Sequence, residues 1–393
     1  MYDVAVAGGG PAGLAAARAA ARGGASVVVL EREPAFGIPT RTSGGSFISP
    51  LRALGVPDRL WAPMHEVRFV GPTTEAVFHF DVPEVCVLDV RALYQWLATE
   101  AAAAGAELQL RTTVSGLRRE NGGVTLFVRR GGGGGGPDTC SARFAVDSTG
   151  TAAVLAGATG LHPPYRRRGV GAELDLAAPA FPADVCVLAM GKALAPSGYA
   201  WAFPYSPGRV RLGVGVMRPD SDADPRALLE RARCLPALRA LLEDAQPIEL
   251  HAGVIPAEPL RARVVSGGVV CCGDAASHAS TLVGEGIRFA IGAGEAAGGA
   301  LAEAVRRGDE RPLASYERSW RRRHGRSFAI AYRINRRLAT FDDDHWDRAV
   351  ATLGSTPAWF ATAALATDFR PQLLLRLLAT RPRLAWSLVR AAT

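Results

Sequence analysis

The pattern of apolar and polar positions at the start of the chain predicts a strand, a turn, a helix and a second strand. Residues 2–7 form a short apolar run that is typical of a buried strand, and an alanine-rich segment that reaches about Arg22 favours a helix. Residues 25–30 form a second apolar run. This order of elements is typical of a βαβ unit in a parallel sheet.

A glycine-rich turn joins the first predicted strand to the helix. Its residues are Gly8, Gly10, Pro11, Ala12 and Gly13. Gly8 allows a tight turn, Gly10 lets the backbone approach a pyrophosphate, and Gly13 lets the helix pack closely on the strand. Free N–H groups at the helix start favour phosphate, and Glu31 at the end of the second strand suits a ribose hydroxyl. The pattern predicts a dinucleotide site, with a merely structural glycine turn as the alternative.

A second strand followed by a helix of small residues is predicted far along the chain. A buried strand is predicted at residues 268–273, and Asp274 and His278 follow it. A helix of small residues is predicted from 288 to about 304.

Three further strands, at residues 112–117, 124–130 and 140–146, predict a β-meander. The glycine run at residues 131–136 is expected to be a mobile hairpin tip.

Composition and charge narrow the class of protein. The 393 residues are 48% hydrophobic and 21% charged, which fits one large or two intimate globular domains and excludes a disordered polyelectrolyte. The net charge of +8 is spread along the chain, so no nucleic-acid partner is expected. Lys192 is the only lysine, and the excess of arginine is interpreted first as coding bias.

The cysteines indicate whether disulfides or a metal site are expected, and the first residues indicate the cellular compartment. The six cysteines form no Cys-x-x-Cys pair and no Cys/His cluster with zinc spacing, so we expect neither a disulfide framework nor a metal site. The predicted first strand leaves no room for a signal peptide, which predicts a cytoplasmic protein.

The late strand, Asp274 and the following helix resemble flavoproteins of the para-hydroxybenzoate hydroxylase-like fold. The resemblance implies FAD, with Asp274 accepting a hydrogen bond from a ribityl hydroxyl. It also implies that the helix start faces the pyrimidine edge of the flavin, where the helix dipole stabilises the charge of reduced flavin. That helix start is formed by Gly284, Gly286 and Ile287. The alternative role for Asp274 is a helix N-cap.

Four more residues are expected near FAD. Arg91 matches a family arginine near the ribityl or phosphate region, and the backbone of Val114 matches a position that pairs with adenine. Arg32, beside Glu31, is expected to contact the cofactor. Arg41 is assigned to the cofactor as well, with a substrate diphosphate as its alternative ligand.

A motif of alternating aromatic residues resembles the geranylgeranyl reductase family. Tyr199, Trp201 and Phe203 precede Pro204, and residues 212–216, Leu-Gly-Val-Gly-Val, resemble the Val-Gly-x-Gly strand that follows the motif in the family. Alternate residues of a strand share one face, so the three rings would line an apolar cavity, with an ordinary sheet core as the alternative. Ser43 stands where the family commonly carries a cysteine and is expected, with the three rings, to contact the substrate, but a hydroxyl cannot supply thiolate chemistry.

These patterns predict an α/β (α+β) fold with a Rossmann-like FAD-binding domain, an antiparallel-sheet substrate domain and C-terminal helices. The FAD-binding domain is expected to be discontinuous, over residues 1–160 and 261–330. The substrate domain spans residues 161–260, and a helical segment spans residues 331–393.

The resemblance implies an FAD-dependent oxidoreductase that reduces alkene bonds of a prenyl or other extended apolar substrate. His278 is the first candidate proton donor, with a structural histidine as the alternative, and Tyr199 is the second catalytic candidate. NAD(P)H or a ferredoxin-like electron-donor protein would reduce the flavin transiently. A monooxygenase or oxidative cyclase of polyketide or terpenoid natural products stays open, as does a purely structural FAD. Halogenation is disfavoured, since Lys192 is the only candidate for the lysine that flavin halogenases use.

The end of the chain has two interpretations. Residues 349–367 carry no charge, but Gly354, Pro357 and several hydroxyl residues weaken a membrane span. After Asp368 only arginines interrupt the apolar residues, which fits peripheral contact with an anionic membrane. A C-terminal helix packed on the core is the alternative.

Overall fold

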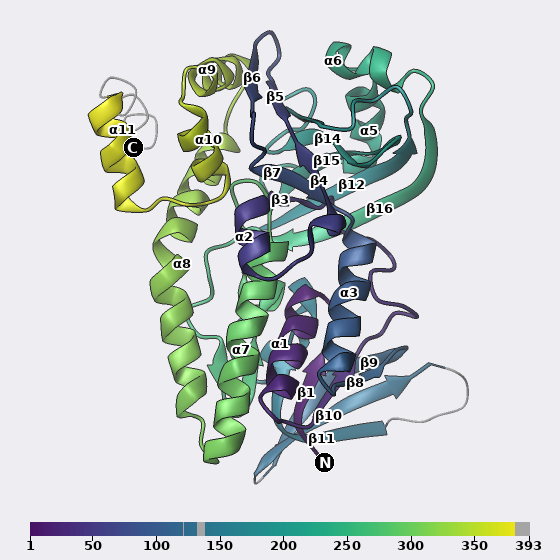
Figure 1. The fold of residues 1–393 in the computed structure, drawn as a ribbon, viewed down its shortest axis with the longest axis vertical. Coiled ribbons are helices and arrows are strands. Elements are labelled where there is room, and N and C mark those ends of the chain that lie inside the picture. Colours follow the sequence, from purple (N-terminus) through teal and green to yellow (C-terminus); the bar gives the residue numbers. More distant parts are fainter. Residues whose placement is uncertain (121, 132–137, 382–393) are drawn as a thin grey trace.

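The computed structural model describes residues 1–120, 122–131 and 138–381 (Figure 1). The glycine run expected at residues 131–136 lies outside this part of the chain except for Gly131, as do residues 382–393 of the C-terminal segment.

An eight-stranded sheet contains the N-terminal strand. Its main order is β17-β18-β11-β1-β2-β8, and β10 pairs with β11 and β9. Strand β1 lies parallel to β2 and β11, and the meander β9–β10–β11 is antiparallel. The strands are β1 (Tyr2–Ala7), β2 (Val27–Leu30), β8 (Glu107–Gln109), β9 (Thr112–Glu120), β10 (Gly123–Arg130), β11 (Asp138–Asp147), β17 (Val265–Ser266) and β18 (Val269–Cys271).

The helices α1 (Pro11–Arg22), α3 (Val90–Ala103) and α7 (Ile287–Arg307) pack together beside this sheet (Figure 1). Small residues let α1 and α7 approach closely, because a Cβ at Gly294 would overlap the carbonyl oxygen of Ala12. Alanines of both helices and the valines of β1 and β2 form one buried core. This packing holds the start of α7 next to the start of α1.

A seven-stranded sheet forms the second layer, in the order β16-β12-β15-β14-β13-β5-β6. It is antiparallel except for the parallel pair β13–β5. Two of its strands come from residues 66–79, which the sequence interpretation had placed with the first domain. The strands are β5 (Glu66–Val70), β6 (Glu75–His79), β12 (Arg168–Ala177), β13 (Val185–Ala189), β14 (Tyr199–Ser206), β15 (Arg209–Arg218) and β16 (Gln246–Pro256).

One face of the second sheet is an ordinary apolar core, in which Ala172, Leu212 and Val214 pack with α5 (Pro225–Arg233) and α6 (Pro236–Arg239). Since successive side chains point to opposite faces, Gly171, Glu173 and Trp201 lie on the other face. A three-stranded sheet completes the strands: β3 (Gly45–Phe47), β4 (Trp61–Met64) and β7 (Val85–Leu88).

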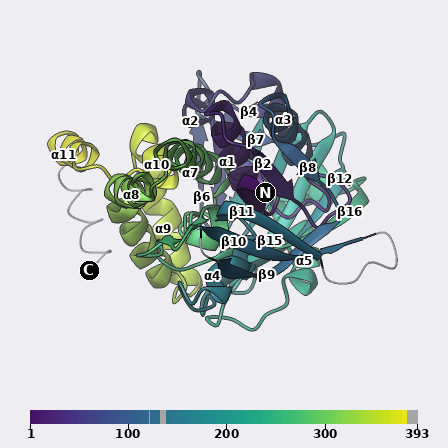
Figure 2. The same cartoon turned by 90° about the horizontal axis from the view of Figure 1, so that it is seen from below.

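The C-terminal helices gather on one side of the molecule (Figure 2). They are α8 (Arg311–Leu338), α9 (Asp343–Gly354), α10 (Ala358–Leu365) and α11 (Pro371–Thr380). The charge-free stretch of residues 349–367 is divided between α9 and α10, with Pro357 capping the start of α10. No helix in the described ranges has the length and apolarity needed to cross a membrane.

The predicted fold class is confirmed: a Rossmann-like unit, a second sheet and C-terminal helices are all present. The remaining elements are short: α2 (Ile48–Ala53), α4 (Val154–Ala158) and four 3₁₀ turns at Asp58–Leu60, Gly150–Ala152, Ala240–Leu242 and Gly273–Ala276.

Candidate functional site

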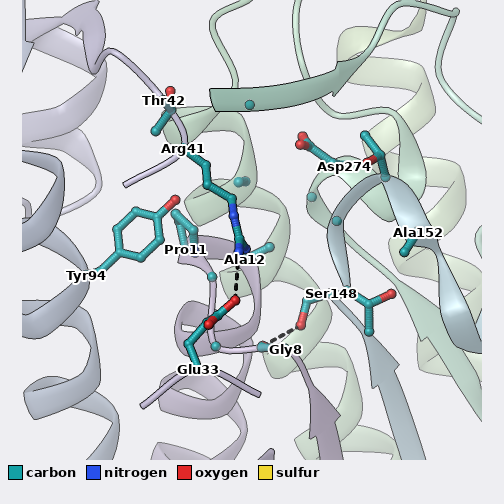
Figure 3. Close-up of a pocket in the computed structure, with 18 of the residues that line it drawn as sticks. Gly8, Pro11, Ala12, Glu33, Arg41, Thr42, Tyr94, Ser148, Ala152 and Asp274 are labelled. Atoms are coloured by element: carbon teal, nitrogen blue, oxygen red, sulfur yellow. Dashed lines mark hydrogen bonds and ion pairs between the residues drawn. The ribbon is translucent and has the colours of Figure 1, made fainter. Parts of the chain in front are cut away.

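A cavity of about 530 Å³ opens where β1 and β2 end and α1 and α7 begin (Figure 3). Its wall contains most residues that the sequence assigns to the cofactor: Gly8, Gly10, Pro11, Ala12, Glu31, Arg32, Arg41, Val114, Asp274, Gly284, Gly286 and Ile287. Segments that are far apart in the sequence therefore meet at one site.

The glycine turn is shaped for a close-lying ligand. A Cβ added at Gly10 would meet no atom within 4 Å, so this backbone faces open space. Gly8 has φ +98°, which favours glycine, and its carbonyl oxygen accepts a hydrogen bond from the Ser148 hydroxyl at 2.8 Å. A Cβ at Gly13 would overlap the Gly8 carbonyl oxygen and the Ser148 hydroxyl, so Gly13 packs inside the protein and supports the turn.

Charged side chains surround the end of the cavity near Glu31. The Glu31 carboxylate accepts hydrogen bonds from the N–H groups of Gly9 at 2.6 Å and Glu33 at 2.9 Å. Arg41 reaches Glu33, with 2.6 Å between Nη2 and Oε1 (Figure 3). Arg91 is not among the residues that line the cavity and pairs with Glu249 at 3.2 Å.

Asp274 lies in the short turn Gly273–Ala276 and points into the cavity from the side opposite Arg41 (Figure 3). Its side chain does not cap that turn. Burial alone raises the pKa of this carboxyl to about 6. A half-buried acceptor that faces the cavity fits a cofactor hydroxyl, and the open backbone at Gly10 fits a pyrophosphate, so the residues present fit FAD.

His278 is not among the residues that line the cavity. Its ring is buried 4.9 Å from the ring of Trp320 on α8, and its Nδ1 accepts a hydrogen bond from the Gly273 N–H at 3.2 Å. Burial and the neighbouring His324 lower its pKa to about 3, so the imidazole is neutral. This geometry favours the structural alternative that the sequence left open for His278.

A second cavity of about 100 Å³ adjoins the first. Arg41, Thr42 and Gly284 line both of them. Ser43, Tyr199 and Trp201 are in the wall of the second cavity, as the sequence predicts for a substrate site.

The aromatic side chains of β14 form a row, with ring centroids 5.7 Å apart for Tyr199 and Trp201 and 6.3 Å apart for Trp201 and Phe203. The Tyr199 hydroxyl donates to the Val283 carbonyl at 2.5 Å. Phe203 packs on Gly45 with the buried core, outside the residues that line either cavity.

Glycines form the floor beneath the Trp201 indole. Gly171, Gly215 and Gly253 stand directly opposite one another on β12, β15 and β16, and Gly213 stands opposite Trp201. A Cβ at Gly213 would lie 2.2 Å from two ring atoms of Trp201. The missing side chains leave the room that the indole and the second cavity occupy.

A buried charged cluster, missed by the sequence interpretation, completes this wall. Glu173 Oε2 accepts from Trp201 Nε1 at 2.7 Å, and Glu173 Oε1 lies 3.2 Å from His251 Nδ1. His251 Nε2 lies 3.3 Å from Glu249 without hydrogen-bond alignment, and Arg211 Nε lies 3.9 Å from Glu173. We call Glu173 and His251 the acid pair.

The sequence does carry a faint signal for this cluster. Glu173 and Asp175 alternate with apolar residues in the buried strand β12, which places two carboxylates on one face. Their partners stand on β15 and β16, so only the strand register reveals them.

Comparison with known proteins supports FAD as the ligand of the first cavity. A family model described as an FAD binding domain matches residues 1–329. The fold, the glycine turn and this match define an FAD-binding flavoprotein.

Curated relatives narrow the class further. Digeranylgeranylglycerophospholipid reductase 2 of Methanothermobacter thermautotrophicus is 30% identical over 363 residues, which cover 90% of this chain and 91% of that protein. The digeranylgeranylglycerophospholipid reductase of Methanothrix thermoacetophila is 28% identical over 398 residues, with 98% of each chain covered. The chain belongs to the geranylgeranyl reductase family of FAD-dependent oxidoreductases.

A solved structure shares the fold over nearly the whole chain. The geranylgeranyl bacteriochlorophyll reductase-like protein of Thermoplasma acidophilum superposes with a TM-score of 0.84 at 23% identity, covering 99% of each chain.

Proposed function

We propose that this protein reduces alkene bonds of a prenyl or other extended apolar substrate that lies in the second cavity against FAD in the first. The observation that carries the proposal is that the two cavities adjoin and have lining residues in common, among them Arg41, Thr42 and Gly284. When bound, reduced FAD supplies a hydride. Similarity to reductases of digeranylgeranylglycerophospholipid supports a lipid-linked isoprenoid as substrate.

The chain's own residues would bind and orient the cofactor. The N–H groups at the start of α1 and the open backbone at Gly10 suit the phosphates, and Glu31 suits the adenosine ribose. Asp274 would accept from the ribityl chain. The N-terminus of α7, at Ile287, would place the positive end of the helix dipole by the flavin ring.

The apolar wall would orient the substrate and exclude water. The Tyr199 and Trp201 rings line the second cavity with Val216 and Ile255, and an extended alkene fits such a surface. Ser43 stands in the same wall, so the reaction we propose uses no thiol at that position.

We infer that the flavin is reduced by a transient donor, NAD(P)H or a ferredoxin-like protein. The described residues contain one glycine turn of the dinucleotide-binding type, and that turn lines the cavity that we assign to FAD. A nicotinamide donor would therefore bind only transiently. Anaerobic mixing of the oxidised enzyme with NADH, NADPH or reduced ferredoxin, followed by flavin absorbance, separates these donors.

We also propose a cytoplasmic enzyme that contacts the membrane surface through its C-terminal segment. On α11, Leu375 is 64% exposed and Leu378 is exposed as well, while Arg376 lies 4.3 Å from the Trp359 ring. Flotation with anionic vesicles tests this: Leu375→Ser with Leu378→Ser should reduce binding, and unchanged binding would contradict the contact.

The proposed reaction is tested by product analysis. Reduced enzyme incubated with a digeranylgeranylglycerophospholipid in detergent micelles should give a product two hydrogens heavier per reduced double bond. Turnover that requires oxygen and inserts it into the product would instead indicate the monooxygenase alternative.

A further inference from the structure

The second cavity has one strongly charged wall in otherwise apolar surroundings. Glu173 and His251 both line it, and their side chains are only 5% and 3% exposed. Burying ionisable groups beside an apolar pocket costs free energy unless they are paired, and here each is paired with the other. Packing alone does not require such groups at this place.

The acid pair is connected to solvent on its far side. His251 Nε2 lies 3.3 Å from Glu249, whose side chain is 37% exposed. Glu249 therefore lies on the solvent side of the acid pair, and both members of the pair line the cavity. A proton lost at the cavity can be replaced from water along this short path.

We propose that the acid pair of Glu173 and His251 delivers the proton in alkene reduction, an inference that rests on the proposed function. The hydride adds to one alkene carbon, and the proton held between His251 Nδ1 and Glu173 Oε1 adds to the other. Two electrons pass from the reduced flavin to the substrate, so an alkene becomes an alkane and the flavin is oxidised. The pair then regains a proton from water through Glu249.

The two residues singled out from sequence are less suited to donate a proton in this structure. The Tyr199 hydroxyl already donates to the Val283 carbonyl, and burial raises its pKa. His278 is neutral and faces Trp320 rather than a cavity.

The charges around His251 favour its protonated form. Burial disfavours the charged imidazolium, but the hydrogen bond to Glu173 on β12 and the negative charges of Glu173 and of Glu249 on β16 outweigh it and raise the pKa of His251. Arg211 on β15 faces Glu173, and Arg91 on α3 faces Glu249, so each carboxylate also has a second cationic neighbour. The net shift of the His251 pKa is upward, which favours the form in which the acid pair holds a proton.

The activity test follows flavin reoxidation in a single turnover. Reduced holoenzyme is mixed without oxygen with a digeranylgeranylglycerophospholipid in micelles, over a range of pH. Because the pair must be protonated, the wild-type rate should fall as pH rises through the pKa of the pair. His251→Gln should lower the rate about 100-fold or more and remove this pH dependence. Glu173→Gln should also lower the rate.

Asp175→Asn is the matched control. Asp175 lies on the same strand and face as Glu173 and is equally buried, but it pairs with Arg209 and Tyr205 and lies outside both cavity walls. Its variant should keep the wild-type pH profile. A His251→Gln enzyme with the wild-type rate and profile would overturn the inference.

An NMR titration of the histidine ring needs no substrate. The signal absent from His251→Gln should titrate above the ordinary histidine pKa of about 6.5 and move down in Glu173→Gln but not in Asp175→Asn. An ordinary pKa, unmoved by Glu173→Gln, would overturn the acid pair. A wild-type enzyme that fails to reduce the lipid would overturn the proposed function, and this titration would still decide whether the two residues share a proton.

Discussion

Replacing Gly213 with alanine tests the glycine floor beneath Trp201. The added Cβ would lie 2.2 Å from Cε2 and Cζ2 of the indole and 2.7 Å from Nε1, where carbon atoms normally stay about 3.5–4.0 Å apart. The ring must therefore move by more than about 1 Å into the second cavity. That movement also breaks the hydrogen bond to Glu173.

The magnitude follows from these two losses. Overpacking of this kind costs about 1–3 kcal/mol, and a lost hydrogen bond to a charged group costs about 1.5–3 kcal/mol more. The sum is about 2.5–6 kcal/mol. An unfolding entropy of about 2.1 cal/mol/K per residue gives about 0.8 kcal/mol/K for this chain, so Tm should fall by about 3–7 °C.

Differential scanning calorimetry measures the effect, with Gly171→Ala as control. A Cβ at Gly171 would lie 3.4 Å from the same indole, which is ordinary contact, so its Tm should stay within about 1 °C of wild type. A Tm of Gly213→Ala equal to that of wild type would refute this reasoning. An equally large fall in the Tm of Gly171→Ala would refute it as well.

Three further changes address the cofactor site. Gly10→Ala should leave the Tm of the apoprotein unchanged but weaken FAD binding at least about tenfold, or about 1.4 kcal/mol, by fluorescence titration, because its Cβ projects into the cavity. Gly13→Ala should instead lower the Tm, since its Cβ overlaps Gly8 and Ser148; equal Tm values in the two variants would contradict the assignment. A cofactor hydroxyl favours ionised Asp274, so FAD binding should tighten as pH rises through about 6 and then level off, and Asp274→Asn should lose this dependence.

The cofactor site could be predicted from the sequence because its chemistry lies in continuous segments. The turn from Gly8 to Gly13 places its own backbone, and Asp274 follows directly after a strand that pairs beside β11. Local sequence determines such geometry, so the spacing of a few residues was enough to predict the cavity wall.

The substrate side was only partly predictable, because it depends on which strands pair. Alternation along β14 puts Tyr199, Trp201 and Phe203 on one face, but it could not show that Tyr199 and Trp201 line the second cavity while Phe203 packs against Gly45. The acid pair joins residues 173 and 251 through the register of β12 and β16. A single sequence does not reveal that register.

An anaerobic single turnover tests the central claim most directly. The enzyme is reduced, freed of excess reductant and mixed without oxygen with a digeranylgeranylglycerophospholipid, while flavin absorbance and product mass are recorded. The proposed function predicts flavin reoxidation with one double bond saturated per flavin oxidised. Flavin that stays reduced until oxygen is admitted, with the lipid unsaturated as before, would contradict it.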